Sequence, residues 1–298
     1  MSTDYLNKFV SSYGIKQICT TNKASNSNLF HLPLDHYVLS NFVQRVLPNL
    51  HEPFTLVSND GDYYFDSNFV NSNFIEKILK TPNLKNWFVQ NLYTDHVKLK
   101  HLPIGQDYHT LYLRPSGFNV DRIVTPFEQE NIIENILMSS KKIEDRKLLA
   151  YCNWNLHLDR GDRTECFNSI EHSSCYFEPT RINRFETWKT QSEMSFVISP
   201  FGGGPDCHRT WEALSLGCIP ILKRTPLSPV FEDLPCVFVD DWREVNLQFL
   251  SDSLTSVLNK KYNFSKMFLQ YWKSQFEGDQ SFNTNNMYAK SMKELYVA

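Results

Sequence analysis

The densest group of residues able to do chemistry lies in the stretch SFVISPFGGGPDCHRTWEALSLGCIPI, residues 195–221. The three glycines Gly202–Gly204 carry no Cβ, so the backbone there can approach a ligand closely. His208 and Arg209 follow at the start of an expected helix, and Glu212 comes one helical turn later. The unpaired amide groups of a helix start attract anions. Anion donors beside a carboxylate that accepts hydroxyl hydrogen bonds suit a nucleotide diphosphate that carries a sugar.

The elements expected around this loop would place it at the end of a sheet. We predict buried strands over Ser195–Ser199 and Cys218–Leu222, with a helix over His208–Leu216 between them. A Gly-Pro loop also joins strand to helix in many folds that bind no ligand there. In that alternative, Arg209 is a solvated surface charge and His208 is a simple helix-start residue. The order of glycines, basic pair, acid and strands favours a donor site, to which we assign Gly202, Gly203, Gly204, His208, Arg209 and Glu212.

Two arginines near the end of an expected strand extend this donor site. Arg160 and Arg163 follow the strand predicted over Lys147–Cys152. The planar fork of arginine matches phosphate oxygens, and two arginines can neutralise a diphosphate leaving group. In the alternative, Arg163 pairs with Asp159 or Glu165 on the surface. Two further arginines of this region, Arg181 and Arg184, are weaker candidates for the donor site.

The base that would deprotonate an acceptor is expected on loops of the first half of the chain. Asp35 precedes an expected helix, and Asp60 follows an expected strand, so we name both as candidates. Asp35 could equally be an ordinary residue of the helix start. Asp60-Gly61-Asp62 could instead be a plain turn, or could hold Mn²⁺ or Mg²⁺ on a diphosphate. We expect no essential metal.

Alternating helix-like and strand-like segments in the first half predict a mostly parallel sheet covered on both faces. The expected helices are Leu34–Leu47, stopped by Pro48, and Phe74–Lys80; the expected strands are Phe54–Val57, Trp87–Gln90 and Leu99–Ile104.

The pattern lapses from Arg114 to Glu130, which we interpret as a linker before a helix over about Glu128–Ser139. Residues 1–125 would form an acceptor-side α/β domain and residues 126–298 a donor-binding one, with a further strand over Val237–Val239 and a mainly helical tail from Leu247, interrupted around 278–286. Ligands of open parallel sheets bind at the carboxyl ends of the strands. We therefore expect two α/β domains that face a cleft.

Composition excludes several classes of protein. With 298 residues, 41% hydrophobic and 21% charged, the chain can fold into about two ordinary globular domains. The net charge of −3 argues against a nucleic-acid binder. No apolar run approaches the ~20 residues of a membrane span, and the first residues lack a signal-peptide pattern. Seven cysteines without a CxxC pair indicate reduced thiols, as in the cytoplasm.

The stretch HRTWEALSLGCIPIL, with PVFEDLP at 229–235 and VDDW at 239–242, resembles the exostosin-like glycosyltransferases. Segments around Trp87–Asn91 and Leu102–His109 resemble the amino-terminal half of related bacterial and viral proteins. The resemblance implies the GT-B architecture, in which two Rossmann-like domains bind the nucleotide sugar mainly through the second. It also implies that Glu212 holds ribose hydroxyls and that Arg209 and its helix start face the diphosphate. Unlike animal exostosins, this chain shows no membrane anchor and no second transferase domain.

These observations predict a glycosyltransferase that moves a sugar from a nucleotide-sugar donor to a hydroxyl acceptor such as a glycan. From the resemblance we expect inversion, and we expect no metal and no cofactor beyond the donor. One alternative is a metal-dependent GT-A transferase that uses Asp60 and Asp62. Another is a nucleotide-binding α/β module without catalysis. The identities of base, sugar and acceptor do not follow from the sequence.

Overall fold

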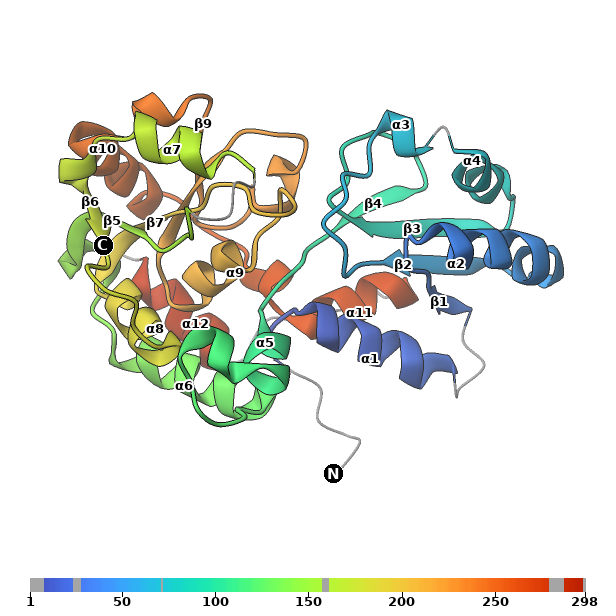
Figure 1. Ribbon diagram of the computed structural model, residues 1–298, viewed down its shortest axis with the longest axis horizontal. Helices are drawn as coiled ribbons and strands as arrows, with labels where there is room; N and C mark the ends of the chain where they lie inside the picture. Colours follow the sequence, from blue (N-terminus) through green and yellow to red (C-terminus); the bar gives the residue numbers. More distant parts are fainter. Residues whose placement is uncertain (1–7, 24–27, 71, 157–160, 279–286, 297–298) are drawn as a thin grey trace.

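The computed structural model describes residues 8–23, 28–70, 72–156, 161–278 and 287–296, and these form two parallel sheets side by side (Figure 1). The first sheet has the strand order β1-β2-β3-β4, and the second has the order β6-β5-β7-β8-β9. Every strand pairs in parallel with its neighbour. Parallel sheets need both faces covered, and helices supply that cover here.

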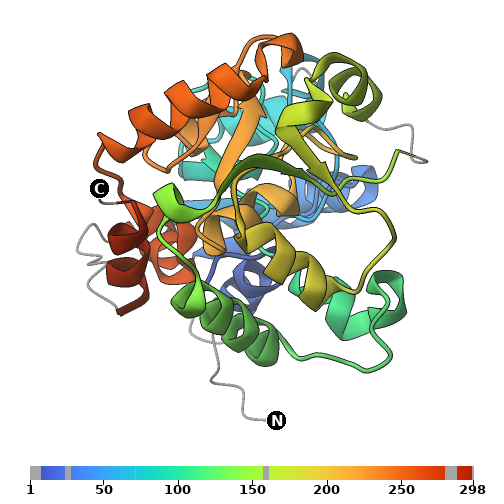
Figure 2. The same ribbon diagram turned by 90° about the vertical axis from the view of Figure 1, so that its left-hand side faces the viewer.

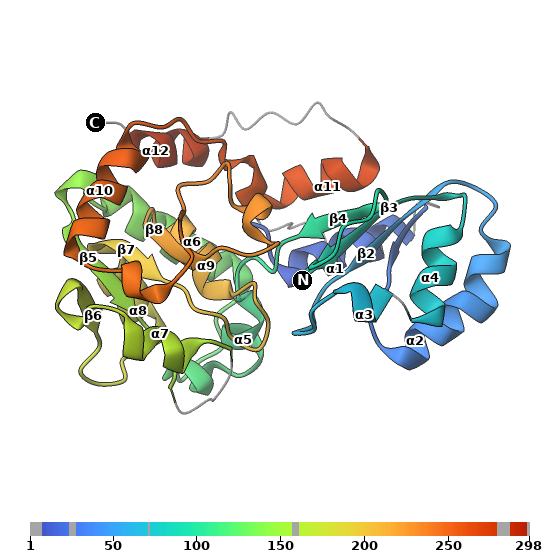
Figure 3. The same cartoon turned by 90° about the horizontal axis from the view of Figure 1, so that it is seen from above.

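Helices lie on both faces of the first sheet (Figure 3). Its strands are β1 (Leu29–His31), β2 (Phe54–Ser58), β3 (Leu84–Gln90) and β4 (Leu99–Leu102). One face carries α2 (His36–Asn41), α3 (Ser67–Val70) and α4 (Asn73–Lys80). The other carries α1 (Ser12–Lys23) and α11 (Leu269–Glu277), a helix from near the end of the chain.

The second sheet has the 2-1-3-4-5 order of a doubly wound fold. Its strands are β5 (Lys147–Cys152), β6 (Cys175–Phe177), β7 (Met194–Ile198), β8 (Ile219–Lys223) and β9 (Val237–Val239). Its helices are α5 (Tyr108–Leu113), α6 (Pro126–Ser139), α7 (Arg163–Ser169), α8 (Arg184–Ser192), α9 (His208–Ser215), α10 (Leu247–Leu258) and α12 (Met287–Leu295). Helices α7 and α10 lie on the opposite side of the strands from α6 and α8 (Figure 2).

The predicted elements around the glycine loop are confirmed. All five residues of β7 are buried, as are most of β8, which is why these strands are continuous apolar runs. Between them α9 begins at His208. Both Trp211, which is 1% exposed, and Cys218, which is fully buried, are core residues.

The helix predicted over Leu34–Leu47 is present but irregular. It runs as α2, then as a π-helical turn over Phe42–Val46, and ends in a 3₁₀ turn over Leu47–Asn49 that contains Pro48. The helix expected near Glu128 begins at Pro126, because Thr125 and Glu128 form a reciprocal capping box there. The helical tail was predicted to be interrupted around residues 278–286. Apart from Gly278, that segment lies outside the described residues.

The chain passes from the first sheet to the second directly after β4. Residues 103–107 lead into α5, which packs on α6, and Val120 and Val124 of the predicted linker are buried in the larger hydrophobic core. Near the other end, α11 returns to the first sheet and packs on α1 (Figure 1). The division of the chain at residues 125 and 126 stays a prediction.

The fold is α/β, with two parallel sheets side by side, each covered by helices on both faces. Within the part of the chain that is described, no helix combines the length and the apolar character that a membrane crossing requires.

Candidate functional site

The carboxyl-end loops of the two sheets touch each other. The loop after β7 lies against residues that follow β2 and β3: a Cβ added to Gly204 would lie 2.7 Å from Asn91 Nδ2, and one added to Gly203 would lie 2.6 Å from Asp62 Cγ. Asp206 N–H donates to Asn91 Oδ1 at 3.1 Å. We call this contact the seam. It joins the loops at residues 59–62 and 91 to the loop at residues 202–206, through Asp62 and Asn91 on one side and Gly203, Gly204 and Asp206 on the other.

Two non-glycine residues of the seam have left-handed backbone conformations. The φ angle is 71° at Asp60 and 56° at Asn91, directly after β2 and β3. Asparagine and aspartate tolerate this region better than most residues, but a cost remains, and such strain gathers at functional sites. Asp60 N–H donates to Gln90 Oε1, and Asn91 Nδ2 donates to Gly61 O, so the two loops hold each other in place.

Asp206 connects the two halves behind the seam. Its Oδ2 accepts from Ile104 N–H at 2.7 Å on the segment after β4, and its Oδ1 accepts from Trp211 Nε1–H at 2.9 Å on α9. Burial raises the pKa of Asp206 to about 6. Asp206 is not among the residues predicted from the sequence, although its place between the glycines and the start of the helix was a signal for it.

The three glycines of the expected donor loop make close contacts with protein atoms. Besides the seam contacts of Gly203 and Gly204, a Cβ added to Gly202 would lie 3.0 Å from Arg163 Nη2 and 3.3 Å from Cys207 Sγ. The close backbone approach that the glycines predict is therefore present, and its partners here are side chains. Their contact with a diphosphate stays a prediction.

Arg163 and Arg209 both point at the backbone of this loop. Arg163 begins α7, and its Nε and Nη1 donate to Phe201 O at 3.3 Å and to Asn155 O at 3.2 Å. Arg209 Nη1 donates to Pro200 O at 3.0 Å and to Ser199 Oγ at 3.4 Å. Of the two surface partners considered for Arg163, Glu165 pairs with Lys223, and Asp159 lies outside the described residues. Arg160 lies outside the described residues.

Glu212 is buried and ion-paired. It is 1% exposed, and its Oε1 accepts from Arg184 Nη2. The Arg184 guanidinium lies 4.2 Å from the ring centre of Phe118. Burial raises the pKa of Glu212, although the charge of Arg184 opposes the rise. From the sequence Arg184 is a weaker donor-site candidate than Arg163, yet it is Arg184 that pairs with Glu212, the predicted ribose acceptor.

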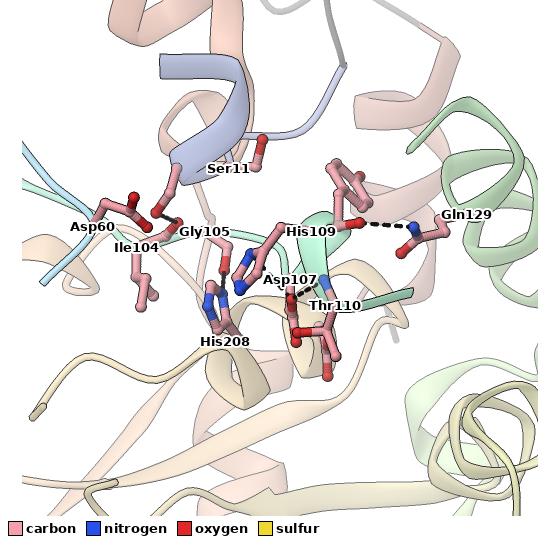
Figure 4. A network of polar contacts seen from close by, with 12 residues as sticks. Ser11, Asp60, Ile104, Gly105, Asp107, His109, Thr110, Gln129 and His208 are labelled. Carbon is pink, nitrogen blue, oxygen red and sulfur yellow. Dashed lines mark hydrogen bonds and ion pairs between the residues drawn. The ribbon is translucent and has the colours of Figure 1, made fainter. Parts of the chain in front are cut away.

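His208 of α9 meets the start of α5 (Figure 4). Its Nδ1–H donates to Gly105 O at 2.7 Å, which leaves a lone pair on Nε2 when the ring is neutral. His109 Nδ1 lies 3.2 Å from Asp107 Oδ1, which also accepts from Thr110 N–H at 3.0 Å. Burial alone would raise the pKa of Asp107, but the neighbouring charges of His208, Arg184 and His109 hold it below its ordinary value.

Asp107, His109 and His208 each offer one ligand atom, and these atoms lie within 4.8 Å of one another. Two imidazoles and a carboxylate can hold a transition-metal ion if they close toward it. The same arrangement can serve proton transfer, because an ionised Asp107 orients His109 through Nδ1 and leaves Nε2 to accept a proton. Asp107 and His109 follow β4, far from His208 along the chain, so only the fold brings the three together.

Asp35 and Asp60, the two expected base candidates, line one cavity of ≈ 370 Å³ at the carboxyl ends of β1, β2 and β3. Asp35 Oδ1 accepts from the N–H groups of Tyr37 and Val38, so it does cap α2, as the alternative interpretation expected. Asp60 forms an ion pair with Lys16 of α1. The structure therefore brings the two candidates together in one cavity next to the seam.

No protein-family model and no curated protein matches the chain. Seven chains of solved structures are similar to it. They include the α,α-trehalose-phosphate synthase (UDP-forming) of Burkholderia vietnamiensis, at 10% identity and a TM-score of 0.41, over 95% of this chain and 79% of that one. They also include the UDP-GlcNAc 2-epimerase of Methanocaldococcus jannaschii, in complex with UDP-GlcNAc and UDP, at 12% identity and a TM-score of 0.30, over 84% of this chain and 75% of that one.

Proposed function

We propose that this chain transfers a sugar from a nucleotide-sugar donor to a hydroxyl acceptor. One observation carries the proposal: the loop with Arg163, Arg209 and the start of α9 touches the loop beside the cavity that holds Asp35 and Asp60. Cationic and backbone donors from one sheet thus lie next to carboxylates from the other. Transfer needs both, because a diphosphate departs on one side while a hydroxyl loses its proton on the other.

The donor would bind along the second sheet. Arg163 and Arg209 would neutralise the diphosphate together with the amide groups at the start of α9. The contacts that Arg209 makes among the described residues use Nη1, so the guanidinium retains donors on Nη2 and Nε. Glu212 would accept from ribose hydroxyls through an oxygen that Arg184 orients. Gly202, Gly203 and Gly204 would let the loop pass close to the phosphates once the seam opens.

The acceptor would bind in the cavity beside Asp35 and Asp60. A carboxylate there takes the proton of the acceptor hydroxyl, and the hydroxyl oxygen forms a bond to the anomeric carbon. The bond from that carbon to the phosphate oxygen breaks, and the nucleoside diphosphate leaves with the electron pair. Direct displacement inverts the anomeric centre, and the resemblance of residues 208–222 to exostosin-like transferases supports this outcome. We place the charge stabilisation on Arg163 and Arg209, without a metal.

The cytoplasm is the compartment that we propose. All seven cysteines are free thiols, and four of them, Cys19, Cys152, Cys166 and Cys218, are buried core residues.

The test of this proposal is a binding and turnover assay with a donor panel. Thermal shift against UDP, GDP, ADP and CMP compounds identifies the base, because a ligand that binds only the folded state raises its apparent stability. The corresponding nucleotide sugars are then assayed for release of nucleotide with and without hydroxyl acceptors. Saturable binding without release would leave a nucleotide-binding module instead of an enzyme.

A further inference from the structure

A second cavity of ≈ 790 Å³ adjoins the one that holds Asp35 and Asp60. The two share the lining residues Leu34, His36 and Tyr63, so they lie side by side, and one ligand could extend over these residues from one into the other. The second cavity lies among α2, α3 and the start of α4. It is not part of the donor site, and nothing in the reaction described above uses it.

The linings of the two cavities differ in chemistry. Apolar and aromatic side chains line much of the second cavity, including Leu39, Phe69 and Phe74. The ring of Phe74 packs edge-on against the His36 ring at 5.2 Å. Tyr63, at the junction, is 67% exposed and so available to a ligand. Such a lining favours a ligand portion without hydrogen-bonding groups.

The first cavity has a polar lining, but most of its side chains are already engaged. Gln90 Nε2 donates to Gly61 O at 3.0 Å, and Asn59 Oδ1 lies 2.7 Å from His31 Nε2. Ser58 Oγ donates to Leu32 O. These contacts fix the loops. Asp35 and Asp60 are engaged through one oxygen each, Asp35 Oδ1 with the N–H groups of Tyr37 and Val38 and Asp60 Oδ2 with Lys16. We assign their other carboxylate oxygens as the acceptors for ligand hydroxyls.

We propose that the acceptor is amphipathic: a hydroxyl-bearing head binds in the cavity of Asp35 and Asp60, and an apolar aglycone binds in the cavity of Leu39, Phe69 and Phe74. This inference rests on the proposed function for its claim that the ligand is a glycosyl acceptor. Binding itself does not require the donor. Burial of each methylene in the second cavity strengthens binding by up to about fourfold, from ~0.8 kcal/mol per CH₂.

The test compares methyl, butyl and octyl β-D-glucopyranoside, with phenyl β-D-glucopyranoside as an aromatic aglycone, all below micelle-forming concentrations. Binding is measured by calorimetry without donor. We expect affinity to rise by at least tenfold from methyl to octyl, or from methyl to phenyl. Equal affinities across the four glucosides would overturn the proposal.

Filling the cavity separates specific binding from general detergent effects. Asn68 lines the second cavity from an exposed position, so Asn68→Trp fills space without removing core packing. Asn41→Trp, at an exposed position of α2 outside either lining, is the matched control. We expect Asn68→Trp to lose most of the increase in affinity that the longer or aromatic aglycone produces. Asn41→Trp should retain this increase. An unchanged gain in Asn68→Trp would contradict the assignment.

The outcomes also separate this inference from the proposed function. Aglycone-dependent binding without turnover of any nucleotide sugar would support the amphipathic ligand and contradict the transfer reaction. Turnover with a KM for the acceptor that does not depend on the aglycone would support the transfer reaction and contradict the amphipathic acceptor.

Discussion

Gly203 faces Asp62 across the seam so closely that any side chain at residue 203 would meet the Asp62 carboxylate, with a Cβ 2.6 Å from its Cγ. One residue on, a Cβ at Gly204 would meet Asn91 Nδ2 at 2.7 Å and the Asp62 carbonyl oxygen at 3.2 Å. The glycine loop therefore joins the two halves of the molecule. A donor that binds along this loop would contact both sheets.

Gly204→Ala should destabilise the protein more than Gly203→Ala. The exposed Asp62 side chain can turn away from residue 203, but Asn91 cannot move without loss of its bonds to Gly61 and Asp206. We expect a loss of about 1–3 kcal/mol for Gly204→Ala and under about 1 kcal/mol for Gly203→Ala. Urea unfolding measures both. Gly117→Ala, with its nearest atom at 4.0 Å, is the control and should be neutral or slightly stabilising.

Arg209→Ala and Arg163→Ala should weaken donor binding by about ten- to a hundredfold each, since each removes charge-assisted hydrogen bonds worth ~1.5–3 kcal/mol. Titration calorimetry with the nucleoside diphosphate from the thermal-shift panel measures this loss. Arg122→Ala is the matched control, because Arg122 forms an exposed ion pair with Glu128. If all three variants bound the nucleoside diphosphate with the affinity of the wild type, the donor would not bind at this loop.

The pair of Glu212 and Arg184 allows structure and binding to be separated. Arg184→Met leaves the Glu212 carboxylate buried without its partner, and we expect a loss of about 3–5 kcal/mol in the free energy of unfolding. Adding Glu212→Gln to that variant should restore part of the loss, because the buried charge is gone. Glu212→Gln alone keeps an amide oxygen for Arg184, whose charge also lies near Asp107, so it should destabilise the protein less than Arg184→Met and raise the KM for the donor. A KM equal to that of the wild type would show that Glu212 serves the fold alone.

Asp206 should make stability depend on pH near 6. Its folded-state pKa of about 6 lies above the ordinary value of 3.8, so its contribution is fully present below about 3.8 and is lost as the pH rises through about 6. Between pH 7 and pH 4 this group should add on the order of 3 kcal/mol at most. Asp206→Asn removes the titration, so the wild type should become more stable relative to the variant as the pH falls. A constant difference would contradict this.

Chelation should leave transfer unchanged if Arg163 and Arg209 supply the positive charge. EDTA treatment followed by donor turnover tests this. Loss of activity on chelation, restored by a divalent ion, would favour a metal site. His208→Ala would then distinguish the cluster of Asp107, His109 and His208 from the Asp60 and Asp62 pair, because it removes a ligand from the cluster alone.

The sequence predicts the elements of this fold well where a buried strand or an amphipathic helix leaves a periodic pattern. The strands β5 and β9 have the predicted bounds, and α9 begins at the predicted residue. Shorter or less apolar elements escaped prediction. β6 has three half-buried residues, and α8 has few apolar residues, so neither shows a clear period.

The group Gly202–Gly204, His208, Arg209 and Glu212 could be named from the sequence, since these residues are close together along the chain. That they bind a donor stays a prediction. Their long-range partners could not be named from the sequence. Arg184 lies 28 residues from Glu212, and Asn91 lies 115 residues from Asp206, so only the fold brings these pairs together. The cavity of Asp35 and Asp60 likewise depends on how three strands end at one edge.

The central claim is that the two facing sheets bind a nucleotide sugar and transfer its sugar. Its most direct test is the release of nucleoside diphosphate from a panel of nucleotide sugars, in the presence of hydroxyl acceptors, by wild-type protein and by Arg209→Ala. We expect acceptor-dependent release by the wild type, at least tenfold slower in Arg209→Ala. No release from any donor, or equal release by both proteins, would contradict it.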